Sequence, residues 1–252
     1  MKLLGNLILS TTLLGVIVSS CTTPPVFENE PIISDLQVKF IEVNEPASAR
    51  DTLAIAFHFT DGDGDLGLGP EETFYPFNLR DYQISPITDD TIRFGDPEAG
   101  DYPFEFPYTC LNWELKFKGY EIIDNQQVAI FDTLLYTQNE NHYNITIDWF
   151  VKPNGQSEWE PFDWVLFRPP SCGETFDGRF PRLFDEDRVE DDGTLNPFPL
   201  EGDLQYSMNS DGFLLLFGAD SIRIDVQIKD RQLRPSNTLS KAFTLQGVQQ
   251  GG

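Results

Sequence analysis

The sequence predicts an all-β fold, an antiparallel immunoglobulin-like β-sandwich with a long elaborated middle segment. Apolar and polar residues alternate with a period of two, the pattern of half-buried strands, in stretches at 36–40, 53–59, 113–117, 145–151 and 222–228. Aromatic residues, which favour strands, are abundant, with 21 Phe, 8 Tyr and 4 Trp among 252 residues. No long stretch after residue 30 has the 3.6-residue period of a helix.

The first 20 residues have the pattern of a lipoprotein signal peptide. Lys2 is the only charged residue before Cys21, and the apolar stretch 3–18 ends in small residues. The Cys21 thiol would then receive a diacylglyceryl group, and a further acyl chain such as palmitate would give stable membrane anchoring. The alternatives are an uncleaved membrane helix and ordinary secretion with a free Cys21.

The rest of the chain is predicted to form one domain on a tether. Residues 21–32 contain the lipidated cysteine and a Pro-rich, flexible tether. Residues 33–246 are predicted to form a single β-sandwich with insertions, and residues 247–252 a disordered tail. A division near residue 100 is less favoured, because the first half alone has too few strands to close a core.

The charge balance excludes one large class of partners. The chain has 17 Lys and Arg against 41 Asp and Glu, a formal net charge of −24. Such a surface repels phosphate backbones, so nucleic-acid binding is not expected. It attracts divalent cations or basic partners, or simply keeps an exported protein soluble.

Two cysteines, Cys110 and Cys172, remain once Cys21 is lipidated. Export brings the chain into an oxidising compartment, which favours a disulfide between them. The alternative is two buried free thiols.

The stretch TDGDGDLGLGP at 60–70 is the clearest candidate site. Asp61, Asp63 and Asp65 place three carboxylates at alternating positions in a glycine-rich turn, as at the start of calcium loops. Glu72 stands at the twelfth position, but Leu66 replaces the glycine that an EF-hand needs. A structural calcium ion would therefore lie in a loop between strands.

Topology adds two more candidate ligands. If 52–60 and 221–229 are the second and penultimate strands of an immunoglobulin-like sandwich, the loops that follow them share one end. Asp230 and Asn237 would then lie near the three aspartates.

Two alternatives to calcium stay open, namely ion pairs with Arg231 and Arg234, and a plain turn. The match of Gly62, Gly64 and Gly67 to a dinucleotide fingerprint is discounted, because aspartates between the glycines would repel a pyrophosphate.

No catalytic motif is found, and the chain is not expected to be an enzyme. It has two histidines, His58 and His142, and neither a nucleophile elbow nor a phosphate-binding loop. An aromatic group could stack on sugars but fits a buried strand better; its members are Trp159, Phe162, Trp164 and Phe167.

Several segments together resemble a family. The lipobox and Pro-rich tether, FHFTDGDGDLG at 57–67, FDGRFPRL at 176–183 and IDVQIKDRQLRPSN at 224–237 are similar to a group of uncharacterised lipoproteins of Bacteroidota. The resemblance covers most of the mature chain and implies a single immunoglobulin- or cadherin-like sandwich in the cell envelope. It implies no activity. By analogy with lipoprotein sorting, Thr22 after the cysteine suggests the outer membrane.

The sequence therefore predicts a non-enzymatic, lipid-anchored envelope module for binding, adhesion or assembly, with calcium as a structural ion. Its ligand would be a protein or a glycan. The alternatives are a carbohydrate-binding or carbohydrate-processing surface lipoprotein and a structural subunit of a larger complex.

Overall fold

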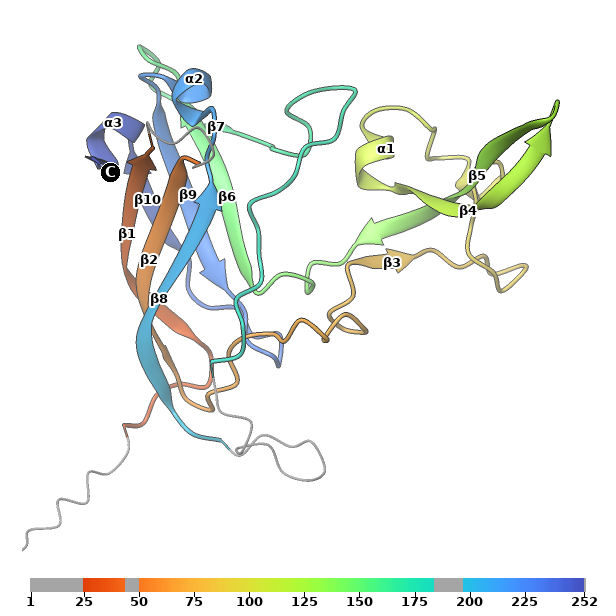
Figure 1. The fold of residues 1–252 in the computed structure, drawn as a ribbon. Coiled ribbons are helices and arrows are strands. Elements are labelled where there is room, and N and C mark those ends of the chain that lie inside the picture. Colours follow the sequence, from red (N-terminus) through yellow and green to blue (C-terminus); the bar gives the residue numbers. More distant parts are fainter. Residues whose placement is uncertain (1–24, 44–49, 184–196, 252) are drawn as a thin grey trace, which may run out of the picture.

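The computed structural model describes residues 25–43, 50–183 and 197–251, and it is built mainly of strands. These strands form two four-stranded sheets and one three-stranded sheet (Figure 1). The prediction of an all-β fold is confirmed. Cys21, the segment before it and the acidic run at 185–192 lie outside the described residues.

The first sheet has the strand order β11-β1-β2-β8. Its strands are β1 (Ile32–Glu42), β2 (Thr52–Asp61), β8 (Leu200–Asn209) and β11 (Gln249–Gly251). β2 lies antiparallel to both β1 and β8. Its alternate residues Leu53, Ile55 and Phe57 are almost completely buried, because one face of the strand points into the core.

The second sheet has the strand order β10-β9-β6-β7. Its strands are β6 (Ile145–Lys152), β7 (Glu160–Pro161), β9 (Ser221–Ile228) and β10 (Leu239–Phe243). In β9 the alternation predicted from the sequence is realised, since Ile222, Ile224 and Val226 are fully buried. They belong to the same hydrophobic core as the buried residues of β2, so the two sheets pack on each other.

Two short helices lie at one end of this sandwich, α2 (Phe213–Phe217) and α3 (Leu245–Val248) (Figure 1). Phe213, Phe217 and Leu245 add to the common core. The opposite end carries the start of β1 and the end of β2, because Ile32 pairs with Thr60.

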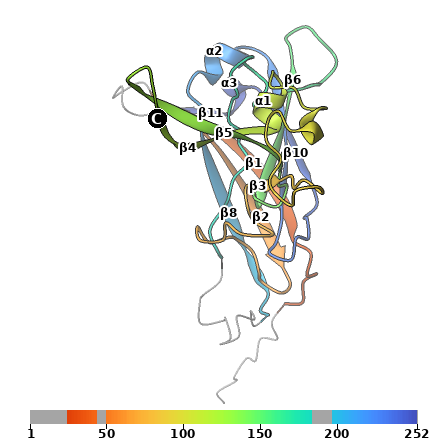
Figure 2. The same ribbon diagram turned by 90° about the vertical axis from the view of Figure 1, so that its right-hand side faces the viewer.

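The middle of the chain forms a third sheet between β2 and β6 in sequence. It contains β3 (Arg80–Tyr82), β4 (Trp113–Ile123) and β5 (Gln126–Gln138), with a short 3-10 helix at Pro97–Ala99 and α1 (Tyr108–Leu111). Residues 80–138, here called the arm, extend away from the two main sheets (Figures 1 and 2). The arm has its own small core of Ile92, Ala99, Trp113 and Leu135.

A disulfide bond between Cys110 and Cys172 ties the arm to the segment that follows β7, with an Sγ–Sγ distance of 1.98 Å. The predicted pairing is confirmed. The two cysteines are 62 residues apart, and closing a loop of that length stabilises a fold by about 4 kcal/mol in the chain-entropy treatment.

Three expectations need correction. Residues 249–251 are not a disordered tail, because they form β11, which runs parallel to β1. The predicted tether is partly docked, because the carbonyl oxygen of Glu28 accepts a hydrogen bond from the backbone N–H of Gly62 (2.8 Å). In β4 the expected apolar face buries only Trp113, whereas Leu115 and Phe117 are 58% and 52% exposed, because no described segment outside the hairpin covers the outer part of this strand. The helices of the described residues all fall short of the length and hydrophobicity that a membrane span requires.

Candidate metal centre

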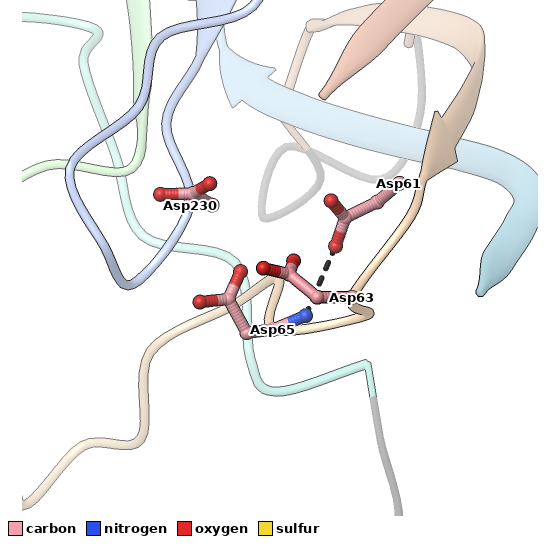
Figure 3. A group of neighbouring side chains, drawn as sticks. All are labelled: Asp61, Asp63, Asp65 and Asp230. Atoms are coloured by element: carbon pink, nitrogen blue, oxygen red, sulfur yellow. Dashed lines mark hydrogen bonds between the residues drawn. The ribbon is translucent and has the colours of Figure 1, made fainter. Parts of the chain in front are cut away.

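Four buried aspartates converge at the end of the sandwich where β1 begins (Figure 3). Asp61 ends β2, Asp63 and Asp65 lie in the loop after it, and Asp230 follows β9. One carboxylate oxygen from each lies within 4.8 Å of the other three. The loops after the strands predicted at 52–60 and 221–229 therefore meet, as expected from the sequence.

The loop after β2 is held in place by backbone contacts from three other segments. Its Gly62 bonds to Glu28, and the carbonyl oxygen of Asp63 accepts a hydrogen bond from the N–H of Phe198 (3.2 Å). The 180–183 segment runs beside it, with hydrogen bonds Leu68 N–H to Phe180 O (3.1 Å) and Leu183 N–H to Leu66 O (3.1 Å).

Gly67 shows how tight this packing is. Its φ angle is +95°, and a Cβ atom built on it would lie 2.1 Å from the carbonyl oxygen of Pro181. Only glycine fits such a position, because any side chain would meet both the steric overlap and the strain of a left-handed backbone. The close approach places Pro181, in the FPRL stretch at 180–183, directly against the DGDGDLG loop.

Inside the cluster, three carboxylate oxygens have no hydrogen-bond partner among the described residues. Asp61 Oδ2 accepts from the backbone N–H of Asp65 (2.9 Å), and Asp63 Oδ2 accepts from Gln232 Nε2 (3.0 Å). The Oδ1 atoms of Asp61, Asp63 and Asp65 are all buried without a partner. Buried polar atoms are normally satisfied, so three such oxygens in one place favour a site that binds a cation or protons.

One arginine partly neutralises the cluster. The Arg234 guanidinium donates to Asp63 Oδ2 (2.5 Å) and, through Nε, to Asp230 Oδ2 (2.5 Å). It is 3.7 Å from Asp65 Oδ1. Of the two arginines considered as an alternative to calcium, Arg234 thus forms ion pairs with the cluster, whereas Arg231 forms an ion pair with Glu72. The four carboxyl groups carry more negative charge than the guanidinium of Arg234 can balance.

The pKa values of three of these aspartates are raised, because the carboxyl groups are buried close to one another. Burial, followed by the nearby charges of Asp65 and Asp63, raises the pKa of Asp61 to about 7. Burial and the charges of Asp230 and Asp63 raise the pKa of Asp65 to about 6. Burial also raises the pKa of Asp230, although hydrogen bonds from Arg234 oppose it. Without a metal ion the cluster therefore takes up protons near neutral pH.

The donor set fits a calcium ion. Calcium binds six to eight oxygens at about 2.3–2.6 Å, so ligands on opposite sides of the ion lie roughly 5 Å apart. The 4.8 Å span of the four carboxylates matches this spacing. All four side chains are hard oxygen donors, and neither histidine nor cysteine belongs to the group, which favours calcium over zinc or copper.

Two predicted or considered ligands have other roles. The Asn237 amide forms two hydrogen bonds to the backbone of Ile33, accepting from its N–H (2.8 Å) and donating to its carbonyl oxygen (2.9 Å). It therefore fastens the start of β1, which corrects its assignment as a metal ligand. Glu72 accepts from the N–H of Gly69 (2.6 Å) and from Arg182 and Arg231. Burial alone would raise the pKa of Glu72, but these hydrogen bonds lower it.

Sequence reasoning missed residues that support the centre from other segments. Gln232 donates to Asp63, and Glu28 and Pro181 pack against glycines of the loop. Gln232 lies inside the segment at 224–237 that was singled out from the sequence, so its place in the chain could have indicated a role. The contacts of Glu28 and Pro181 depend on how distant segments meet, and no local pattern carries that information.

The other residues singled out from the sequence lie away from this centre. His58 pairs with Asp203 (3.0 Å) on the sheet surface, and the Nδ1 atom of His142 lies 2.9 Å from the carbonyl oxygen of Phe77. The indole of Trp164 packs against the common core, stacked on Phe213 at a centroid distance of 5.2 Å. Trp164 therefore packs on the core, as expected, but it lies in a turn and is half-buried, so the expected buried strand is wrong.

No protein-family model matches this chain, and no curated protein or solved structure matches it either. Its function is therefore argued from its own residues.

Proposed function

We propose that this chain is a non-enzymatic, lipid-anchored module of the bacterial cell envelope, in which one calcium ion stabilises the base of a projecting binding arm. Calcium would be held by Asp61, Asp63, Asp65 and Asp230. The module would serve in binding, adhesion or assembly, most simply at the outer membrane.

The observation that carries the proposal is the convergence of four buried carboxylates with three unpartnered oxygens. Arg234 supplies one positive charge to balance the carboxylates. Protonation of Asp61 removes further negative charge, but only below about pH 7. A divalent cation would satisfy all three oxygens at once and remove the repulsion between the carboxylates.

The position of this centre links it to the arm. The loop that contains Asp61, Asp63 and Asp65 leads directly into residues 66–79, which connect the sandwich to β3. Fixing the loop would therefore fix the point from which the arm leaves the sandwich.

The strand order supports an immunoglobulin-like sandwich. The sheets β1-β2-β8 and β10-β9-β6 correspond to the A-B-E and G-F-C strands of that fold. In this comparison, the arm is an insertion between the second and third strands.

Membrane attachment is supported by the N-terminal sequence alone. Because β1 begins at the end of the sandwich that contains the aspartates, an anchor at Cys21 would place the centre on the membrane-proximal side. Replacing Cys21 with Ser should abolish the incorporation of labelled palmitate and release the protein from membranes. Unchanged labelling would contradict lipidation at this residue.

The calcium part of the proposal is tested by thermal unfolding of the full chain in mild detergent, with calcium and then with chelator. Saturation at 100 times the Kd should stabilise the folded state by about 2.7 kcal/mol and raise Tm by roughly 5–10 °C. An identical Tm in both conditions would contradict a structural calcium ion.

One feature favours a glycan ligand as a second candidate. A cleft of about 1020 Å³ lies between the arm and the sandwich, lined among others by Arg80, Glu114, Tyr136, Tyr143 and Asp177. Aromatic rings beside carboxylates suit sugar binding, and the volume is that of a large small-molecule site. A glycan-array signal that disappears on Tyr143→Ala would support this function, and no signal for the parent chain would contradict it.

A further inference from the structure

The β4–β5 hairpin of the arm has one face made of uncharged residues. In the strand register, directly paired residues share a face, and a bulge between Phe117 and Gly119 shifts the alternation by one residue. Ring contacts confirm the assignment, since Phe117 lies 5.1 Å from Tyr120 and 5.8 Å from Phe131 between ring centroids. The large members of this face are Leu115, Phe117, Tyr120, Ile122 and Phe131.

These five side chains form the apolar face of the hairpin, and they are exposed. Their exposed fractions run from 52% for Phe117 to 71% for Ile122. The opposite face contains most of the hairpin's charged residues, with Glu114, Lys116, Glu121 and Asp132 among them. The hairpin is therefore amphipathic, but its apolar side packs against nothing in the described part of the chain beyond its root at Trp113.

The size of the apolar face matches one half of a small stable interface. Five half-exposed large side chains present on the order of 500 Å² of apolar surface, at the upper end of what a monomer normally exposes. When two equal faces meet, the total buried area is about 1,000 Å², the lower limit for a specific interface.

The arrangement of large and small residues fits a second copy of the same face. Leu115 pairs across the hairpin with Thr133, and Tyr120 pairs with Ala129, so most of the larger side chains are on β4, whereas β5 carries smaller ones apart from Phe131. If β4 of one copy lies over β5 of the other, large residues of each copy cover small residues of its partner. A two-fold axis between the copies satisfies both sets of contacts at once.

Charge also favours this occupant. Two chains with a formal net charge of −24 repel each other over most of their surfaces. The hairpin projects from the sandwich and its apolar face has no charged side chain. Contact through the hairpins alone therefore brings two copies together with the least repulsion.

We propose that the apolar face of the β4–β5 hairpin is a dimerisation surface, on which a second copy of this chain packs face to face. The inference does not depend on calcium binding, because it rests on the surface of the arm alone.

Cysteine cross-linking in cells that express the full chain tests the proposal. Ala129→Cys places a thiol on the apolar face, and Val128→Cys, its exposed neighbour, places one on the opposite face. With a short bis-maleimide, Ala129→Cys should give a covalent dimer at least about tenfold more abundant than Val128→Cys. Gln127→Cys, further along the apolar face, should repeat the result.

A second substitution in the Ala129→Cys chain controls for chance collisions. Phe117→Asp on the apolar face should remove the dimer, whereas Ile123→Asp on the opposite face should leave it. Circular dichroism and an intact Cys110–Cys172 bond would show that both variants fold. Equal cross-linking at residues 128 and 129, or no dimer at 129 and 127, would overturn the proposal. The proposal would also be overturned if no dimer formed but the cysteine at 129 were protected from a water-soluble maleimide. That result would mean that lipid or another protein covers the face.

Discussion

The backbone N–H of Asp65 donates a hydrogen bond to the Oδ2 atom of Asp61 (2.9 Å), while the Oδ1 atom of the same Asp61 carboxylate is buried with no partner in the described part of the chain. The turn from 61 to 65 thus orients the carboxylate so that one oxygen is used by the loop and the other points into the cluster. In the calcium site that we propose, this second oxygen would bind the ion.

Without calcium, the free energy of unfolding should fall as the pH rises from about 4 to about 7. The pKa of Asp61 is raised from 3.8 to about 7 and that of Asp65 to about 6. The folded chain therefore holds protons that the unfolded chain has released. This contribution is fully present below the unfolded pKa and is lost as the pH rises through the folded values. Denaturant unfolding across this range measures it, and saturating calcium should flatten the fall. The same fall with and without calcium would contradict a calcium ion bound by these carboxylates.

Asp61→Asn should abolish the calcium-dependent rise in Tm and leave the metal-free chain at least as stable as the parent near neutral pH. The amide oxygen can still accept from the Asp65 N–H, and the neutral side chain needs no proton or cation. Asp35→Asn, at an exposed position of β1, is the matched control and should keep the full calcium shift. Calcium stabilisation of the Asp61→Asn chain equal to that of the parent would exclude Asp61 as a ligand.

Arg234→Gln should destabilise the metal-free chain by about 3 kcal/mol, because it leaves buried carboxylates of Asp63 and Asp230 without their counter-charge. Calcium should restore most of this loss, so the calcium shift becomes larger than in the parent. Arg50→Gln breaks an exposed pair with Asp211 and should cost less than about 1 kcal/mol. If calcium stabilised the Arg234→Gln chain no more than the parent, the cation and the guanidinium would not share the same carboxylates.

Gly67→Ala should destabilise the fold by several kcal/mol, because the new Cβ would overlap the Pro181 carbonyl oxygen and the backbone is left-handed. Gly155→Ala separates these effects, since Gly155 also has a positive φ (+88°) but no described atom lies within 4 Å of the position that an added Cβ would take. The control should lose only about 1 kcal/mol. Urea unfolding of both variants measures the two losses in free energy of unfolding. Equal losses would mean that the 180–183 segment moves to make room for the new methyl group, which would contradict the tight packing at Gly67.

The strands of the sandwich could be predicted from the sequence because burial on one face imposes an alternating pattern. β2 and β9 show this plainly, with Leu53, Ile55, Ile222 and Ile224 all buried. Once these strands were placed, the meeting of Asp230 with Asp61 followed from the shared end of their loops.

Other features could not be predicted because they depend on distant contacts. The alternation in β4 indicates an apolar face but does not say what covers it, and here the described chain covers only Trp113. The role of Asn237 depends on where the start of β1 lies, 204 residues earlier in the chain. Residues 249–251 form a strand only because β1 offers them an edge.

Calcium titration of the chelator-treated full chain by calorimetry, near neutral pH, tests the central claim most directly. We expect one calcium ion per chain, with proton release on binding because the ion displaces protons from Asp61 and Asp65. We also expect binding to be lost in Asp61→Asn and kept in Asp35→Asn. Absence of binding in the parent chain, or equal binding in the Asp61→Asn chain, would contradict the claim.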